Sequence, residues 1–391
     1  MKDFFIDKKN NKLNIKKIII LVIICIFLIA IVTTFIIYNT NQDIQKWIDV
    51  YVLNKELRQD NVTSIELEEE NSKVCAFNQY IGVLSKNSFT IYNSNGNQEN
   101  KLTMEITTPI FDSNNRFLAV AEKNGKKVYL ISNKEISWEK QIDGDISQIM
   151  VNKNGYVAIT VVNTSYKTVI EMYNPQGEEM FKTYLSTTRT ADVDISNDNK
   201  YLAIAEIDTS GTKIQSSAKI ISVEKAQTDP TNSVEKIYAS EAGKLITNLK
   251  YQDNNKLISM FTDGIDIIED GNESNLTNST NKKITFSTID LQNSVATVEE
   301  KSSGLFTADS VLKFINIKSK EEKEYITNEV TKEIYSKDDI LALNLGSEVD
   351  FVNTSGWLVK KYISNQEITS MVLSNSIAGI VFRNRIEIIK F

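Results

Sequence analysis

The residues that most often carry enzymatic chemistry are scarce in this chain. It has 391 residues with no histidine and only two cysteines, Cys25 and Cys75. The lack of histidine excludes Ser-His-Asp and Cys-His catalysis, histidine-ligated zinc and histidine-based pH switching. No glycine-rich phosphate loop, metal-spaced cysteine pair or Gly-x-Ser-x-Gly elbow occurs in the sequence. We therefore predict no catalytic residue, no cofactor and no metal site.

The acidic residues leave one kind of catalysis open. Asp192-Val-Asp194 with Asp198 superficially suggests a calcium loop, but it lacks the central glycine and the terminal glutamate. Its apolar alternation is typical of a strand entering a turn. The chain has 51 Asp and Glu residues, and a pair of them facing a channel could cleave a glycoside. A carbohydrate-active hydrolase or lyase is thus the enzymatic alternative, although we expect the protein not to be an enzyme.

The charge is distributed unevenly along the chain. The whole protein carries 44 basic and 51 acidic residues, a net charge of -7, whereas residues 1–38 hold six lysines and two aspartates. The remaining 353 residues must then carry -11. Phosphate contacts require clustered Lys and Arg. We therefore expect no nucleic-acid partner.

An uncharged apolar run predicts a membrane anchor. Ile18 to Tyr38 is 21 residues long, with two threonines as its only polar interruptions. At 1.5 Å per residue it is long enough to cross a hydrocarbon core of about 30 Å. It ends without the small residues of a signal-peptide cleavage site. The six preceding lysines place the N-terminus in the cytoplasm by the positive-inside rule. We predict an integral single-pass protein of the cytoplasmic membrane, with a cytoplasmic tail over 1–17 and a transmembrane helix over 18–38.

The segment 39–60 is predicted to be a juxtamembrane helix or stalk. Ile44, Trp47, Ile48 and Tyr51 recur at helical spacing. Trp and Tyr at such positions either sit at the headgroup level of a bilayer or pack against the following domain. The extracytoplasmic domain then covers 61–391.

From residue 62 onward the sequence is a repeat of short strands. Alternating β-branched and aromatic runs are separated by Asn, Gly, Asp and Ser, with only three prolines in the chain. The runs recur in sets of four, with first strands starting near 73, 109, 146, 191, 245, 284, 329 and 368. A period of about 40 residues is that of a four-stranded propeller blade. We predict an all-β propeller of about eight blades behind the N-terminal transmembrane helix. Seven blades are the alternative if a weak unit over 264–300 is misread.

The last unit supplies only three strands, and an unpaired strand over 62–68 precedes the first unit. Pairing them would complete the eighth blade and remove two open sheet edges. We therefore expect Ile65 or Leu67 to lie against Ile386 or Ile388.

Two segments carry a resemblance to known propellers. Ser196-Asn-Asp-Asn-Lys-Tyr-Leu-Ala203 is similar to the Ser-Pro-Asp-Gly-Lys-x-Leu-Ala signature of TolB-type and WD-repeat-like blades, and Asp112-Ser-Asn-Asn-Arg-Phe-Leu-Ala119 is a looser copy. Both lack the Pro and Gly. The whole chain also resembles a clostridial family of single-pass membrane-anchored proteins classed as a domain of unknown function. The resemblance implies fold and topology, and it brings no function.

The predicted function is that of a binding or scaffold module of the cell envelope, with a protein or an envelope polymer as partner. A membrane sensor is a further alternative, although the cytoplasmic tail is short and basic. The loops 208–216 and 301–309 between second and third strands are long, and such loops commonly carry contacts. The predicted partner-binding residues, from these two loops, are Thr212, Lys213, Leu305 and Phe306.

Overall fold

The computed structural model describes residues 15–40, 48, 62–70, 72–278, 283–302 and 308–391. The chain divides into two units, Met1–Arg58 and Gln59–Phe391. The described part of the first unit is chiefly helix α1 (Ile15–Thr40). The second unit contains all the strands of the described chain.

Helix α1 exposes the apolar side chains described along it, such as Phe27 and Phe35, each 66% exposed. The side chains of 15–21 and of Cys25 lie outside the described residues. Over the residues that are described, no helix is both long and apolar enough to cross a membrane. The transmembrane helix over 18–38 therefore stays a prediction. The stalk predicted over 39–60 falls almost entirely outside the described residues.

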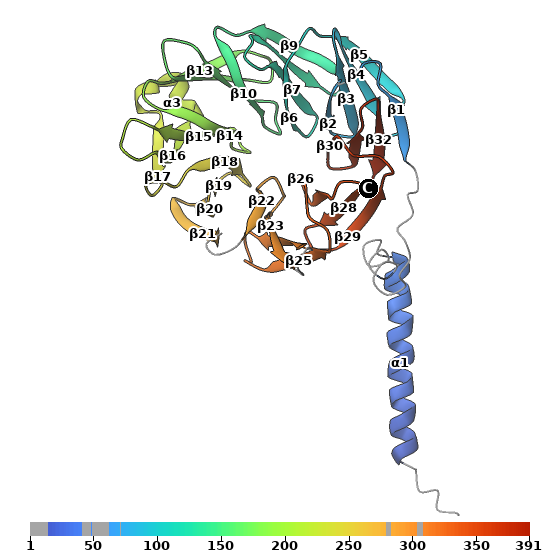
Figure 1. Cartoon of the computed structure of the whole chain (residues 1–391). Coiled ribbons are helices and arrows are strands. Elements are labelled where there is room, and N and C mark those ends of the chain that lie inside the picture. Colours follow the sequence, from blue (N-terminus) through green and yellow to red (C-terminus); the bar gives the residue numbers. More distant parts are fainter. Residues whose placement is uncertain (1–14, 41–47, 49–61, 71, 279–282, 303–307) are drawn as a thin grey trace, which may run out of the picture. The chain divides into compact units, whose positions relative to one another are not determined.

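The second unit is an eight-bladed propeller, and each blade is a four-stranded antiparallel sheet (Figure 1). We number the blades from the one that begins with β2. Blades 1 to 4 are formed by β2 (Lys73–Phe77), β3 (Tyr80–Ser85), β4 (Ser88–Asn93) and β5 (Gln98–Thr103); β6 (Pro109–Asn114), β7 (Phe117–Glu122), β8 (Lys127–Ser132) and β9 (Glu135–Gln141); β10 (Asp145–Val151), β11 (Val157–Val162), β12 (Thr168–Tyr173) and β13 (Glu179–Leu185); and β14 (Arg189–Ile195), β15 (Tyr201–Asp208), β16 (Gln215–Ser222) and β17 (Val234–Ala239).

The other four blades follow the same order, except that the last takes one strand from the N-terminal end. They are formed by β18 (Ile246–Tyr251), β19 (Lys256–Phe261), β20 (Gly264–Glu269) and β21 (Asn272–Asn278); β22 (Ile284–Thr288), β23 (Ser294–Ser302), β24 (Ala308–Asn316) and β25 (Glu322–Thr327); β26 (Glu333–Lys337), β27 (Ile340–Asn344), β28 (Glu348–Asn353) and β29 (Leu358–Ile363); and β30 (Ser370–Leu373), β31 (Ile377–Val381), β32 (Arg385–Lys390) and β1 (Thr63–Glu66). The prediction of eight blades is confirmed, and the alternative of seven is wrong. The short helices α3 (Val223–Thr228) and η2 (Pro230–Asn232) interrupt blade 4 and were not predicted.

Asparagine makes many of the turns that join these strands. Ten described residues other than glycine have a positive φ, and all but Lys320 are Asn or Asp. Asn124, which precedes Gly125 in the turn between β7 and β8, has a φ of 58°. Asn and Asp tolerate this left-handed conformation because their short polar side chains bond to the local backbone. Seven of these ten residues are asparagines.

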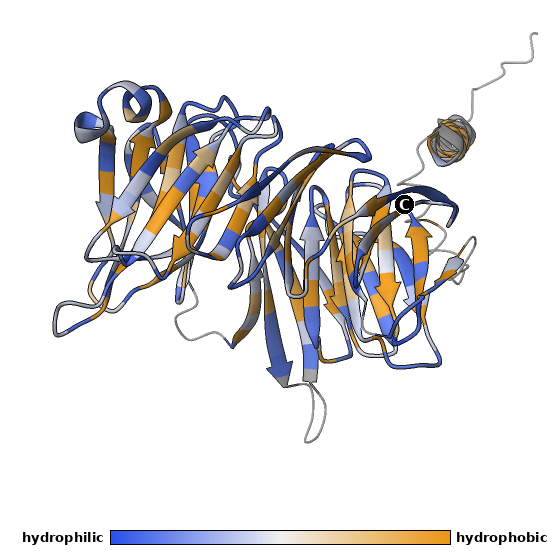
Figure 2. Ribbon diagram, turned by 90° about the horizontal axis from the view of Figure 1, so that it is seen from above, coloured by the Kyte–Doolittle hydropathy of each residue, from blue (hydrophilic) through white to orange (hydrophobic). Residues whose placement is uncertain are grey.

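The apolar core lies between successive blades, where the strands are orange in Figure 2. One buried cluster joins residues such as Leu130 of blade 2 to Ile159 of blade 3, and both side chains are fully buried. Each blade therefore covers the apolar face of the next. A ring built in this way needs its first and last blades to meet.

Closure of the ring occurs as predicted. Strand β1 pairs antiparallel with β32, with Ile65 opposite Ile386 and Thr63 opposite Ile388. Ile65 is 6% exposed, and Ile386 and Ile388 are fully buried in the same cluster as Ile81 of blade 1. The N-terminal strand of the propeller therefore completes the C-terminal blade.

We predict that truncating Ile65 to alanine lowers the free energy of unfolding by about 2–4 kcal/mol, since it leaves a cavity in the closing blade. Urea denaturation of the full chain would measure the loss. Ser64→Ala, at an exposed position on the same strand, is the matched control and should change stability by less than about 0.5 kcal/mol. Equal stability of the Ile65→Ala variant and the native chain would contradict the closure.

Candidate functional site: the channel and the loop face

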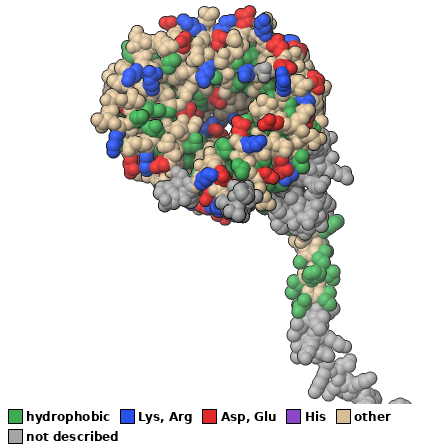
Figure 3. All heavy atoms as spheres, in the orientation of Figure 1, with side chains coloured by type: hydrophobic (Ala, Val, Ile, Leu, Met, Phe, Trp, Pro, Cys, Tyr) green, Lys and Arg blue, Asp and Glu red, His purple; other side chains and the backbone are tan. Residues whose placement is uncertain are grey.

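A cavity of about 530 Å³ lies in the central channel. It is lined from the first strands of blades 2 to 7, which face the centre of the ring in Figure 1. Figure 3 shows acidic and basic side chains around the opening at this centre. The cavity is therefore polar and charged, in contrast to the apolar layers between the blades.

Three aspartates on the first strands of blades 2 and 4 bind the backbone of the next blade. Asp112 Oδ2 accepts a hydrogen bond from the Val151 amide at 2.6 Å. Asp192 and Asp194 do the same for the amides of Leu249 and Tyr251, at 2.8 and 2.5 Å. A carboxylate that accepts a backbone N–H makes one of the stronger hydrogen bonds of a protein. These side chains hold adjacent blades together at the channel wall.

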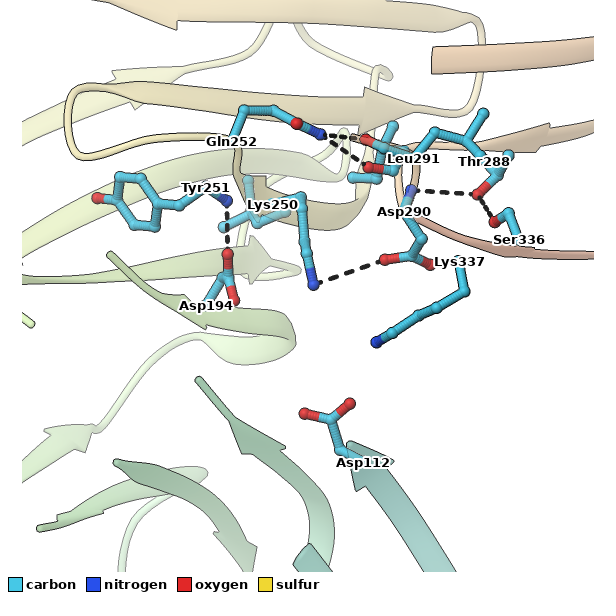
Figure 4. A network of polar contacts seen from close by, with 12 residues as sticks. Asp112, Asp194, Lys250, Tyr251, Gln252, Thr288, Asp290, Leu291, Ser336 and Lys337 are labelled. Atoms are coloured by element: carbon cyan, nitrogen blue, oxygen red, sulfur yellow. Dashed lines mark hydrogen bonds and ion pairs between the residues drawn. The ribbon is translucent and has the colours of Figure 1, made fainter. Parts of the chain in front are cut away.

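Lys250 is the cation at the centre of this arrangement. Its Nζ lies 3.7 Å from Asp290 Oδ1, and Figure 4 shows its side chain extending into the space between Asp194, Asp290 and Asp112. Burial disfavours the charged amine, yet Asp194, Asp290, Asp112 and Asp192 together outweigh this and raise the pKa of Lys250. The lysine therefore stays charged and offsets part of the repulsion among the aspartates.

Two of the aspartates titrate near neutral pH. Burial raises the pKa of Asp194 to about 7, although Lys250 and the Tyr251 amide favour its charged form. Burial likewise raises the pKa of Asp192 to about 6, against the lowering effect of the Leu249 amide. Shifts of this kind occur at active sites and also in structural networks. These two carboxyl groups already have a structural role, because each one accepts a hydrogen bond from the backbone of the neighbouring blade.

A second set of polar contacts links blades 5, 6 and 7. Gln252 Nε2 donates to the carbonyls of Ile289 and Leu291, at 3.2 and 2.8 Å. The hydroxyls of Thr288 and Ser336 lie 2.5 Å apart. Figure 4 shows these contacts beside the Lys250–Asp290 ion pair. Together the two sets form what we call the channel network.

The channel network also links blade 7 to blade 2, because Lys337 Nζ of blade 7 donates to the Ser113 carbonyl at 2.8 Å. Among the described residues, no group of three or more Cys, Asp or Glu side chains is arranged to hold a metal ion. The segment first compared with a calcium loop is strand β14 and its turn, as its alternation indicated. The channel network therefore fixes the blades around a polar cavity.

Thr212 and Lys213, two of the four predicted partner-binding residues, lie on one face of the propeller. Because each blade repeats the same up-and-down order, the links between second and third strands all lie on this face, which we call the loop face. Thr212 and Lys213 are exposed in the link between β15 and β16. Leu305 and Phe306 lie outside the described residues. The four residues therefore stay predictions.

Both long loops are held at their base by a buried serine. Ser216 Oγ donates to the Lys244 carbonyl at 3.1 Å and accepts from the Ile246 amide at 2.8 Å. In blade 6, Ser310 Oγ donates to the Glu329 carbonyl and accepts from the Thr331 amide, both at 2.9 Å. Each serine is 2% exposed. The same arrangement of a serine hydroxyl, a carbonyl and an amide thus fixes two hairpins to the segment that leads to the following blade.

The two hairpins are also the longest of the described chain. Strands β23 and β24 have nine residues each, β15 and β16 have eight, and every other described strand has seven or fewer. In Figure 2, β23 and β24 extend beyond the neighbouring strands at the lower edge of the view. The loop face therefore carries two projections with fixed bases.

A family profile matches residues 53–391, which is most of the chain. The chain belongs to DUF5711, a family of unknown function. This match covers the whole propeller of the DUF5711 chain. None of the curated proteins matches it in sequence.

Solved structures similar to the DUF5711 chain share its fold at low identity. BamB from Moraxella catarrhalis has a TM-score of 0.51 and 12% identity, over 86% of this chain and 100% of BamB. The C-terminal WD40 domain of Sif2 has a TM-score of 0.56 and 12% identity, over 83% and 98% of the two chains. A putative dipeptidyl aminopeptidase IV from Bacteroides ovatus has a TM-score of 0.50 and 12% identity, over 78% of this chain and 54% of that one. At such identities the likeness shows the propeller fold alone.

The pKa of Asp194 is raised, so this carboxyl group binds a proton more tightly in the folded DUF5711 propeller than in the unfolded chain. The contribution of Asp194 to stability therefore depends on pH. It is full below the unfolded pKa of about 4 and is lost as pH rises through about 7. Asp194→Asn keeps an oxygen acceptor for Tyr251 and cannot titrate. We predict that the native chain loses stability relative to Asp194→Asn between these pH values, on the order of 2 kcal/mol.

Urea denaturation of both chains across this pH range would measure the difference. Asp208→Asn is the control, because hydrogen bonds from Ser210 lower the pKa of that exposed carboxyl and so its small effect has the opposite sign. Parallel stability curves for Asp194→Asn and the native chain would contradict a buried, proton-binding Asp194.

Proposed function

We propose that this protein is a binding module held at the outer face of the cytoplasmic membrane, that its loop face docks a protein partner, and that it performs no catalysis. The observation that carries the proposal is the pair of projecting hairpins, β15–β16 and β23–β24, fixed by Ser216 and Ser310. A rigid base keeps the ordering cost of a docking loop low. Loops of this kind on a stable scaffold are the usual sites of recognition.

Exposed apolar side chains on the same face support a protein partner. Tyr166, between β11 and β12, and Tyr184, near the end of β13, are 41% and 53% exposed, and their ring centroids lie 4.7 Å apart. Ile214 in the β15–β16 link is 46% exposed. Aromatic and large aliphatic side chains supply most of the affinity of protein interfaces. Ile214 directly follows the predicted Thr212 and Lys213 in the chain.

The membrane anchor is supported by the sequence. The run from Ile18 to Tyr38 has no charge, and six lysines precede it. Anchoring there would place the tail 1–17 in the cytoplasm and the propeller outside. The loop face would then meet partners in the cell envelope.

The absence of catalysis is supported by the chemistry of the chain and by the occupation of its channel carboxylates. The sequence has no histidine, and Asp112, Asp192 and Asp194 bind the backbone of adjacent blades. A reaction run by carboxylates alone is the remaining enzymatic alternative. Under our proposal, Asp112→Asn leaves partner binding unchanged as long as the fold is retained.

A labelling experiment would test the orientation. Cys75 is buried, so a cysteine introduced by Thr212→Cys would be the accessible thiol of the propeller. We predict that a membrane-impermeant maleimide labels the Thr212→Cys chain in intact cells whose wall has been made permeable. Labelling only after lysis would show that the propeller is cytoplasmic.

Site-specific photocross-linking would test the docking face. We predict that a photoreactive residue at Thr212 or Lys213 of the full chain gives one discrete protein adduct in cells. The same photoreactive residue at Lys153 should give none, because Lys153 is exposed between the first and second strands of blade 3 and so lies on the opposite face.

Leu305→Ser with Phe306→Ser should weaken the adduct, at a binding cost of about 1–4 kcal/mol. Equal adducts from the two faces would overturn the proposed docking face. A single substitution of an Asp or Glu that abolishes the protein's activity in cells without unfolding the chain would overturn the proposal that it performs no catalysis.

A further inference from the structure

A second cavity opens between blades 4 and 5, at the face opposite the loop face. Its volume is about 380 Å³, within the range of about 300–1,000 Å³ that is usual for small-molecule sites. Tyr201 at the start of β15, Tyr251 at the end of β18 and the β20–β21 turn at Asp270 and Gly271 line it. We call it the blade 4–5 cleft.

Three tyrosines from two blades converge on this cleft. Tyr251 is 7% exposed within the apolar layer between the blades, and Tyr201 and Tyr238 pack against that layer while remaining partly exposed. Burial raises the pKa of Tyr251, so its hydroxyl stays neutral and able to donate. The cleft therefore offers flat apolar surfaces with polar edges.

The rim of the cleft is made of amides and charged groups that can pair with hydroxyls. Asn254 and Asn255 are exposed in the β18–β19 turn, and Asn255 Nδ2 lies 3.5 Å from Asp270 Oδ1. An amide both donates and accepts hydrogen bonds, and a carboxylate accepts them. Such a rim suits a ligand that carries many hydroxyl groups.

Lys236 disfavours a cationic ligand in this cleft. Its Nζ donates to the Gly271 carbonyl at 2.7 Å and lies 4.9 Å from the centroid of the Tyr238 ring. Gly271 has a φ of +83°, and a Cβ there would come within 2.9 Å of the Lys236 Nζ, so the lysine rests directly on the turn. The cation position over the Tyr238 ring is thus already taken by the protein itself.

We propose that the blade 4–5 cleft binds a saccharide unit, with its C–H face against the partly exposed Tyr201 and Tyr238 and its hydroxyls on Asn254, Asn255 and Asp270. A pyranose ring has an apolar face and a rim of hydroxyls, which is the pattern that the cleft complements. The site is separate from the loop face and does not depend on a protein partner docking there. It gives the propeller a means of contacting a polysaccharide.

The test is binding of two soluble oligosaccharides, cellotetraose and tetra-N-acetylchitotetraose, to the full chain in a detergent without a sugar head group. Saturation-transfer NMR and calorimetry would measure it. We expect at least one to bind at millimolar concentration, and Tyr238→Ala to weaken it by about tenfold or more. Asn254→Ala with Asn255→Ala, at exposed turn positions, should also weaken it and covers the case in which Tyr238→Ala unfolds the blade.

Tyr184→Ala, which removes an exposed tyrosine on the loop face, is the matched control and should leave saccharide binding unchanged. Binding of neither oligosaccharide at millimolar concentration would overturn the proposal. So would binding that survives both cleft variants. Loss of the cross-linked adduct at Thr212 would bear on the proposed protein partner alone, so the two proposals fail separately.

Discussion

The pairing of β1 with β32 is the constraint on which the rest of the propeller depends. Each blade buries an apolar face against the next, so an open ring would expose one such face at each end together with unpaired strand edges. Four residues, Thr63–Glu66, complete the last blade, and Ile65 enters the apolar layer it shares with blade 1. Closing the ring at this point joins the two ends of the domain in one sheet.

Hydrogen bonds and ion pairs in the channel join the blades in addition to the apolar packing between them. Carboxylates taken out of water are costly unless they are paired or hydrogen-bonded. The buried Asp194 and the partly buried Asp112 and Asp192 each bind an amide of the next blade. Lys250 supplies the opposite charge in their midst. This gives the acidic residues of the channel a structural purpose. The same burial in the channel wall explains why the pKa values of Asp192 and Asp194 are raised in a propeller that we propose to be a binding module.

Much of the fold could be predicted from the sequence, because blade period, turn chemistry and strand alternation are local signals. The unpaired strand at 62–68 even indicated its partner, since an eighth blade lacked one strand. The candidate sites could not be predicted in the same way. Lys250 pairs with Asp290 and interacts electrostatically with Asp112 only because three blades converge on the channel. Ser216 binds Ile246 across a blade boundary. Such contacts depend on the packing of distant segments, and no single segment carries a signal for them.

The loop face and the blade 4–5 cleft both rely on a ring that does not open. Native-state hydrogen exchange of the full chain tests this most directly, because it measures the opening of each strand separately. In a closed ring, the amides of β1 and β32 exchange with the same opening free energy as those of central strands such as β7 and β11. If β1 exchanged far faster, as a fraying terminus does, while β7 and β11 stayed protected, the ring would not be closed in the way described.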